Sequence, residues 1–111
     1  MEKKIRKALN DIGIPCYFVT RGNNDVECIV YNYISFPSYY ADNKLKGTKY
    51  TILINIYSKE KTEFLKNKVL ETMRQNGFKG GSIKATIPVA EQKGQNFYNT
   101  AITFNGFIKA E

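Results

Sequence analysis

The sequence predicts one α+β domain, in which a single antiparallel-rich sheet of four to five strands packs one face against a long helix. Every second residue in the segment 50–56 is a large apolar side chain, and this period of two is that of an extended strand. Shortly afterwards, Leu65, Val69 and Met73 recur every fourth residue and give a helix one apolar stripe. The chain has 111 residues, so we expect a single domain over residues 1–111.

The first element is predicted to be a short amphipathic helix over residues 2–12. Its apolar residues have the helical spacing i, i+3, i+4, i+7, and they are Ile5, Ala8, Leu9 and Ile12. Gly13 is expected to end this helix, and Pro15 prevents its continuation. A short strand over residues 16–19 and a turn-rich break over residues 20–25 are expected to follow.

Two strands are predicted in the middle of the chain, over residues 26–35 and 48–57. The first carries apolar residues on both faces, so we expect it either to be central in the sheet or to meet another subunit. Between the two strands, residues 36–47 are expected to form a loop or an irregular hairpin connection. This segment contains four residues that interrupt regular structure, namely Pro37, Asp42, Asn43 and Gly47.

The long helix is predicted to begin after Ser58, whose hydroxyl is expected to cap it. It is expected to end near Asn76, because Gly77 can adopt the left-handed conformation that follows a helix. Glu63 lies four residues after Lys59 and three before Lys66, so it is expected to form a solvated ion pair with either lysine.

Two further strands are predicted over residues 82–90 and 97–109, joined by a polar turn over residues 91–96. Pro88 indicates an edge strand or the end of a strand, since proline has no N–H to donate. The predicted order of elements is therefore α-β-β-β-α-β-β, with the short N-terminal helix first.

The chain carries 17 Lys and Arg against 10 Asp and Glu, a net charge of +7. Such a charge raises the possibility of a nucleic-acid partner. The basic residues are nevertheless scattered, and the one dense group is Lys3, Lys4, Arg6 and Lys7 on the first helix. The scatter favours a lysine-rich solvated surface over a nucleic-acid site.

Cysteine usage and hydropathy indicate a cytosolic protein with no membrane span. Cys16 and Cys28 could form one disulfide, but the segment 1–13 lacks the apolar run of a secretory leader, so both are expected to remain thiols. No segment approaches the ~18 consecutive apolar residues of a transmembrane helix.

No motif for catalysis, cofactor binding or metal binding is found in the sequence. The chain has no histidine, which excludes Ser–His and Cys–His nucleophiles and imidazole metal ligands. The glycine pair at residues 80–81 follows a helix instead of opening one, so we expect a flexible turn and no phosphate-binding loop. We therefore expect no enzyme activity, cofactor or metal, although a small enzyme with an unrecognised site is a third interpretation.

An alternative interpretation is a small basic accessory domain that binds nucleic acid. Two groups could combine base stacking with positive charge. One is Tyr17 and Phe18 with Arg21, and the other is Tyr31 and Tyr33 with neighbouring lysines. Aromatic residues in strands usually belong to a core, however, and the sequence has no RNP-like pattern.

Several local patterns resemble the tail terminator, or tail completion, proteins of long-tailed phages and prophages. They are the polar break VTRGNND, the strand IVYNYIS, the loop FPSYY, the strand YTILINIYSKEK, the helix EFLKNKVLETMRQNGF and the final strand NFYNTAITFNGFI. The resemblance covers nearly the whole chain and is closest over residues 50–78. It is a similarity of pattern, because no catalytic motif defines these proteins.

The resemblance implies a structural role without catalysis. Such proteins form a ring, commonly a hexamer, on the end of the tail tube, where they stop polymerisation and present a surface to the head connector. The expected partners are other copies of the chain, the major tail tube protein and the head completion protein, with DNA passing nonspecifically through the ring. The expected location is the bacterial host cytoplasm during assembly and then the virion.

Two segments are expected to make the contacts of the ring, because exposed sheet edges and aromatic loops suit protein interfaces. The first is the loop with Phe36, Tyr39, Tyr40, Lys44 and Lys46. The second is the polar turn with Gln92, Lys93, Gln95 and Phe97.

Overall fold

A computed structural model describes the backbone of residues 1–20, 27–41, 44–92 and 95–109. Side chains are described in these ranges except at 37–41, 44–46, 85, 90–92, 95–96 and 109. The helices are α1 (Glu2–Leu9), a 3-10 turn η1 (Asn10–Ile12) and α2 (Thr62–Gln75). The strands are β1 (Cys16–Phe18), β2 (Cys28–Ala41), β3 (Lys44–Ser58), β4 (Lys79–Gln92) and β5 (Gln95–Lys109).

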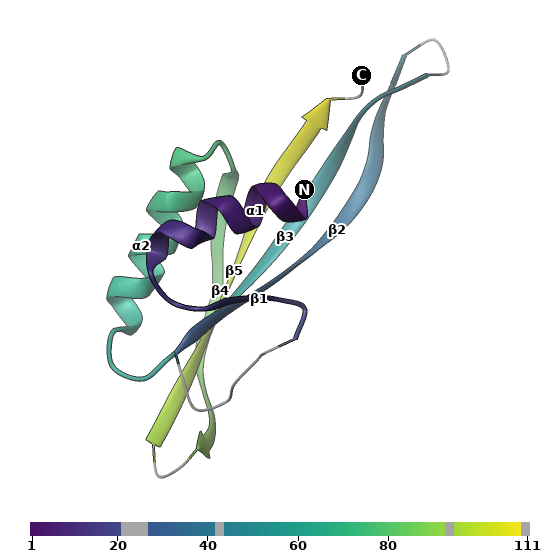
Figure 1. Ribbon diagram of the computed structural model, residues 1–111. Helices are drawn as coiled ribbons and strands as arrows, with labels where there is room; N and C mark the ends of the chain where they lie inside the picture. The colour runs from purple at the N-terminus through teal and green to yellow at the C-terminus, as the bar shows by residue number, and fades with distance from the viewer. Residues whose placement is uncertain (21–26, 42–43, 93–94, 110–111) are drawn as a thin grey trace.

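The strands form one sheet in the order β1-β2-β3-β5-β4. Strand β1 pairs with β2 in parallel, and all the other neighbours are antiparallel. Both helices lie against the same face of this sheet (Figure 1). The prediction of a mixed α+β chain is therefore confirmed.

The core lies between the helices and that face of the sheet. The predicted stripe of α2 is buried at Leu65, Val69 and Met73, and it joins a cluster with Ile54 of β3 and Ile102 of β5. Helix α1 adds Ile5, Ala8 and Leu9 to the same cluster. The periodicity of the helix and of the central strand therefore predicted the packing correctly.

The N-terminal helical segment covers the predicted residues 2–12, although its last turn has 3-10 geometry. Gly13 ends it with a φ of 93°, a value that L-residues with a side chain rarely adopt. Gly77, with a φ of 88°, follows α2 in the same way.

The predicted cap of α2 is wrong. Helix α2 begins at Thr62, its N-cap position is Lys61, and no side chain caps it. Ser58 is instead the last residue of β3 and is fully buried, with its Oγ atom 2.8 Å from Oγ1 of Thr62. The strand is favoured over the helix start at Ser58 because the residue pairs with Tyr98 of β5.

Of the two alternatives predicted for residues 36–47, the described residues form the irregular hairpin connection and no loop. Strands β2 and β3 continue through this segment, and Phe36 pairs with Lys49 while Pro37 pairs with Thr48. The ladder accommodates the irregular residues through register shifts between Pro37, Tyr39 and Tyr40. Proline is tolerated because β2 has no neighbour on its outer side there among the described strands.

The β2–β3 hairpin gives the molecule an elongated shape (Figure 1). The extents along the principal axes are 59 × 23 × 22 Å. The Cα radius of gyration is 15.4 Å, against about 13 Å for a compact domain of this length. One end of the sheet therefore projects beyond the helices that cover its middle.

Strand β4 is an edge strand, as Pro88 indicated, and Pro88 pairs with Tyr98. The glycine pair at residues 80–81 was expected in a flexible turn. It lies instead near the start of β4, where the pairing with β5 shifts register between Gly80 and Ser82. Both glycines have positive φ, and a Cβ atom on Gly81 would lie 2.9 Å from Cδ2 of Leu70. Gly81 therefore allows β4 to pack closely against α2, whereas the atoms nearest to Gly80 belong to β5.

Candidate functional site

The strand register divides the sheet into two faces of different character. Residues 54 and 102 pair and face the helices, so residues 55 and 101, which also pair, face the other side. We call this other side the open face, and its side chains are Asn32, Ile34 and Phe36 of β2, Lys49, Thr51, Leu53 and Asn55 of β3, Asn99, Ala101, Thr103, Asn105 and Phe107 of β5, and Ile87 of β4. No helix of the described chain lies on it (Figure 1).

The open face is apolar and almost uncharged. Four large apolar side chains on it are about half exposed, namely Ile34 (52%), Phe36 (48%), Ile87 (54%) and Phe107 (47%). The other members of the set are mostly Asn and Thr, with Lys49, and Lys79 of β4 lies on the same side because it pairs with Asn105. Exposed apolar side chains with few charges are characteristic of the core of a protein interface.

At one end of the sheet, the side chains on the side of the open face are buried within the chain. Cys28, Val30 and Phe97 point to this side of the sheet and are buried. The ammonium nitrogen of Lys59 lies 5.2 Å from the centre of the Phe97 ring. Phe97 was predicted to be a contact residue, but its side chain is fully buried within the chain, so it is not available to a partner.

A pocket of about 510 Å³ lies at the opposite end, where β4 begins beside β5. Its lining residues are Phe36, Lys49, Tyr50, Thr51, Gly77, Lys79, Asn105, Gly106 and Phe107. Strand β4 starts with the pair Lys79–Asn105, so β5 has no β4 neighbour from Gly106 onward. Residues from both faces of the sheet therefore meet at this uncovered edge.

Two glycines shape this pocket. A Cβ atom on Gly47 would overlap the ring of Phe107, so the absence of a side chain lets this ring lie across β3. A Cβ atom on Gly106 would lie 3.1 Å from Cε of Met1 and 3.4 Å from the Phe78 ring, which lets α1 and the end of α2 pack closely on β5. The pocket thus depends on residues that carry no chemistry themselves.

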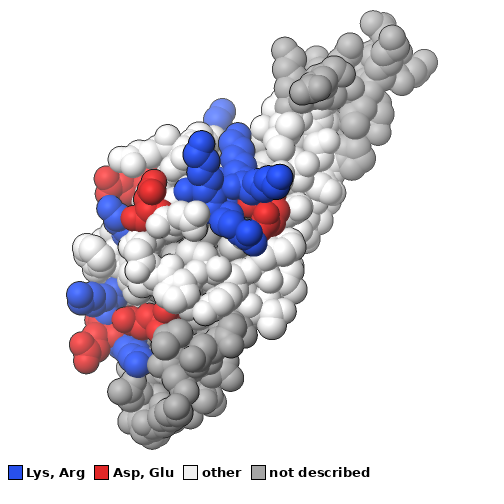
Figure 2. Space-filling model, viewed as in Figure 1, with Lys and Arg blue, Asp and Glu red and all other residues white. Residues whose placement is uncertain are grey.

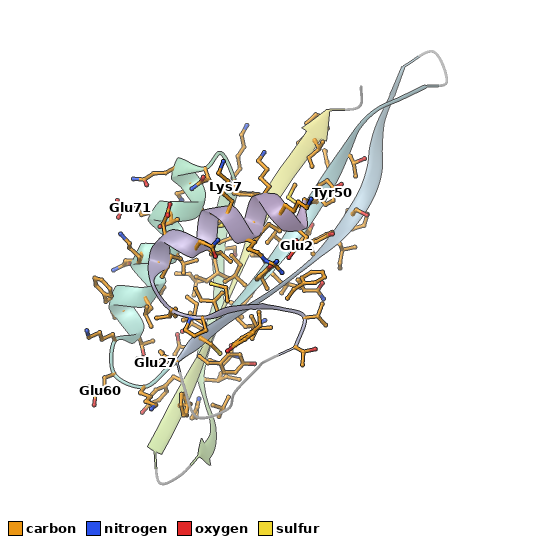
Figure 3. All side chains as sticks on the ribbon, viewed as in Figure 1. Glu2, Lys7, Glu27, Tyr50, Glu60 and Glu71 are labelled. Carbon is orange, nitrogen blue, oxygen red and sulfur yellow. The ribbon has the colours of Figure 1, made fainter. Side chains whose placement is uncertain are left out.

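The helix side of the molecule is charged, in contrast to the open face. Lys and Arg side chains gather over α1 (Figure 2). Lys3, Lys4 and Lys7 are exposed there, and Figure 3 shows Lys7 on the outer side of the helix. On α2, Lys66 and Glu63 form the predicted ion pair at 2.7 Å.

Arg6 belongs to a polar cluster that joins α1 to the sheet. The hydroxyl of Tyr31 donates to Oε1 of Glu2 at 2.7 Å, and Nε of Arg6 donates to the same hydroxyl at 3.2 Å. Arg6 also pairs with Glu2 at 2.7 Å. Burial and then the hydrogen bond to Glu2 raise the pKa of Tyr31, so the phenol is neutral and holds the helix on β2.

The two thiols do not form a disulfide with each other, in agreement with the prediction. Cys16 pairs in register with Ile29, so it faces the helices, whereas Cys28 faces the other side. Burial, followed by the influence of Cys28, raises the pKa of Cys16 to about 11. A thiol of such high pKa is a poor nucleophile at neutral pH.

The other predicted site residues are only partly placed. Phe36 is half exposed at the pocket. The backbones of Tyr39, Tyr40, Lys44, Lys46, Gln92 and Gln95 lie in strands of the two hairpins, but their side chains are outside the described part, and Lys93 lies outside it entirely. Gln92 and Gln95 pair in register in the β4–β5 ladder, and no described interaction joins the other residues of this group.

Three of the four aromatic residues considered for base stacking pack ring against ring on the helix side of the sheet, which leaves Phe18 exposed and Tyr33 partly buried. Tyr31 is buried, while Phe18 packs on the helix side with its ring centre 5.5 Å from that of Tyr31 and 5.7 Å from that of Tyr33. Arg21 lies outside the described residues.

No group of three or more potential metal ligands occurs in the described part of the chain. No helix there is long and apolar enough to cross a membrane. A scan against models of known protein families and a search of curated proteins both find no match to this sequence. The arguments on function therefore rest on the surfaces described above.

Sequence reasoning did not find Lys49, Lys79 or Phe107. They lie on three different strands and become neighbours of one pocket through cross-strand pairing. The sequence contained one signal. Phe36 precedes Asp42 by the same number of residues as Lys49 follows Asn43. A two-residue hairpin turn at those positions would pair them.

Proposed function

We propose that this protein is a structural subunit that works by binding copies of itself and neighbouring rings, as a tail terminator of a phage or prophage does. In this role it caps the tail tube as a ring, which is expected to be a hexamer, and joins it to the head connector. The single observation that carries the proposal is the open face, a broad sheet surface on which four large apolar side chains are about half exposed and over which no helix of the described chain lies.

The size of the surface suits this role. A stable interface removes about 800 Å² of surface from each partner, roughly a tenth of the surface of a small protein. The whole chain exposes 6976 Å², and the open face spans four of its five strands. One sheet face of this extent is sufficient for such a contact.

The shape of the subunit also suits a ring. Head-to-tail closure requires two different surfaces on each subunit, so that one copy can bind the next around an axis. The β2–β3 hairpin and the β4–β5 hairpin are two such surfaces at opposite ends of the molecule (Figure 1). We assign the hairpin contacts to Phe36, Tyr39, Tyr40, Lys44 and Lys46, and those of the β4–β5 hairpin to Gln92, Lys93 and Gln95.

The proposed partners are the major tail tube protein and the head completion protein. The net charge of +7 favours DNA in the lumen of the ring through nonspecific attraction to phosphates. The proposed location is the bacterial cytoplasm during assembly and then the virion.

The test is association with tail tubes, measured by negative-stain microscopy and by sedimentation of the chain with tubes of the same phage. We expect rings on tube ends with the wild-type chain. The variant Tyr39→Ala/Tyr40→Ala is expected to weaken their formation through the hairpin. If this double variant assembles as well as the wild type, the assignment of the hairpin is wrong, and if no variant or wild-type chain binds tubes, the role is wrong.

A nucleic-acid-binding accessory domain is the second candidate, supported by the exposed Lys3, Lys4 and Lys7 on α1. Duplex DNA bound through these residues would show an affinity that falls steeply with salt, with a slope of about −0.9 for each phosphate contacted. A shift of duplex DNA at low micromolar protein that is lost in Lys3→Gln/Lys7→Gln would favour this candidate over the structural one.

A further inference from the structure

The pocket at the start of β4 has a chemical composition that the assembly role does not require. Two lysines, Lys49 and Lys79, line it together with Phe36 and Phe107. No carboxylate occurs among its described lining residues. Lysines without acidic neighbours favour an anion, and exposed rings favour a flat apolar group.

The register fixes how these groups are arranged. Phe36 of β2, Lys49 of β3 and Phe107 of β5 are directly opposite one another in three adjacent strands. Neighbouring strands lie about 4.8 Å apart, so the two phenylalanines stand about 10 Å apart with the lysine between them. The row therefore alternates an aromatic ring, a positive charge and a second aromatic ring.

The next row supplies hydrogen-bonding groups. Thr51 pairs with Asn105, and Asn105 pairs with Lys79, so a hydroxyl, an amide and a second ammonium stand side by side along this row. An amide can donate to and accept from the edge of a nucleobase, while an ammonium can bind a phosphate. Each kind of group in a nucleotide thus has a counterpart in the pocket.

Both rings are about half exposed in the chain, so they are available for stacking. Bases stack on aromatic side chains regardless of sequence, and each stacked base raises affinity roughly tenfold or more. Gly47 supports this arrangement, because it lets the Phe107 ring lie over the strand that carries Lys49. A volume of about 510 Å³ is in the range of ordinary ligand sites.

We propose that this pocket binds a nucleotide unit, with a base stacked on Phe36 or Phe107 and a phosphate held by Lys49 and Lys79. The unit comes either from a free nucleotide or from single-stranded nucleic acid, whose base and phosphate chemistry is the same. The residues of the site all belong to one copy of the chain, but Phe36, Lys49 and Phe107 also lie on the open face, so nucleotide binding is expected to compete with assembly through that face.

The experiment measures binding to the purified chain by fluorescence anisotropy and calorimetry, with ATP and a twelve-residue oligothymidylate as separate probes. Binding of ATP identifies a free nucleotide, and binding of the oligothymidylate alone identifies a single strand. For the oligomer, two lysine contacts predict a log-affinity against log-salt slope of about −1.4. If neither probe binds at millimolar protein, the proposal is overturned.

Two sets of variants separate stacking from charge. Phe36→Leu and Phe107→Leu keep an apolar side chain but remove the ring, and each is expected to lower affinity roughly tenfold. Lys49→Gln and Lys79→Gln are each expected to reduce the steepness of the salt slope by about 0.7. Thermal melting monitored by circular dichroism verifies that each variant is folded.

Matched controls lie outside the pocket. Ile87→Ala changes a similarly exposed residue of the open face, and it should leave affinity unchanged. Lys3→Gln/Lys7→Gln removes two positive charges from α1, and it should also leave binding at the pocket unchanged. If the α1 variant loses as much affinity as the pocket lysine variants, binding is a nonspecific effect of net charge and the proposal is overturned.

A polyglutamate peptide serves as the competing class of partner. It carries the anions but no base, so it should bind much more weakly than the oligothymidylate. Binding of equal strength that is unaffected by Phe36→Leu and Phe107→Leu would show that the pocket recognises acidic protein segments, and it would also overturn the proposal.

Discussion

The two faces of the sheet are built from the same strands, but their side chains differ in kind. Towards the helices, β3 and β5 present Ile54 and Ile102, which are fully buried. Away from the helices, the next residues of the same strands are Asn55 and Ala101, which are only partly buried. One face thus forms the core, and the other exposes large apolar side chains outside its buried end.

The largest effect that should separate the two faces is on stability. Ile54→Ala removes a fully buried side chain from the centre of the core and is expected to lower the free energy of unfolding by about 2–5 kcal/mol. Ile34→Ala makes the same kind of change on the open face, where half of the side chain is exposed, and should cost about 0.5 kcal/mol. Urea denaturation of both variants measures the difference, and equal losses would contradict the division into two faces.

The second effect concerns the shape of the open face near the pocket. Gly47→Ala places a Cβ atom against the Phe107 ring and is expected to cost about 1–3 kcal/mol. In a Phe107→Ala background the ring is gone, so the same change should cost much less. A double-mutant cycle by urea denaturation tests this, and an unchanged cost would mean that the ring does not lie over Gly47.

The third effect concerns the attachment of α1 to the helix-covered face. Tyr31→Phe removes the hydroxyl that joins Glu2 and Arg6, and it is expected to cost about 1 kcal/mol. Tyr98→Phe, on an exposed tyrosine of β5, is the matched control and should change stability little. Thermal unfolding compares the stability of the two variants. If Tyr98→Phe loses as much stability as Tyr31→Phe, the Tyr31 hydroxyl does not attach α1 to the sheet.

The fourth effect is a dependence on alkaline pH. The pKa of Cys16 is raised by burial from 9.0 to about 11, so the folded state retains a proton that the unfolded state releases. The stability contributed by the neutral thiol is therefore complete below pH 9 and is lost as the pH rises from 9 to 11. Denaturation curves of the wild type should show a steeper decline over this interval than those of Cys16→Ala, and parallel declines would contradict the assignment.

The elements with strong periodicity were predictable from the sequence. The stripe at Leu65, Val69 and Met73 and the alternation over residues 50–56 predicted which side chains the core contains. Gly13 and Gly77 predicted the ends of the helical segments, because each occupies a backbone conformation that glycine favours. In these cases the local signal and the tertiary packing agree.

Other features depend on pairing between distant strands, and the sequence did not reveal them. The turn-forming residues of segment 36–47 indicated either a loop or an irregular hairpin, and strand pairing extends β2 and β3 through it with register shifts. Ser58 has the side chain of a helix cap, but pairing with Tyr98 keeps it in β3. The row of Phe36, Lys49 and Phe107 exists only once three strands are aligned.

The most direct test of the central claim is sedimentation with tail tubes of the same phage, using the wild type and the variant Ile34→Lys/Ile87→Lys. Both substituted residues are half exposed on the open face, so the variant should keep the melting temperature of the wild type within a few degrees. We expect the wild type to sediment with the tubes and the charged variant to stay in the supernatant. Equal sedimentation of the two would show that the open face is not the assembly surface.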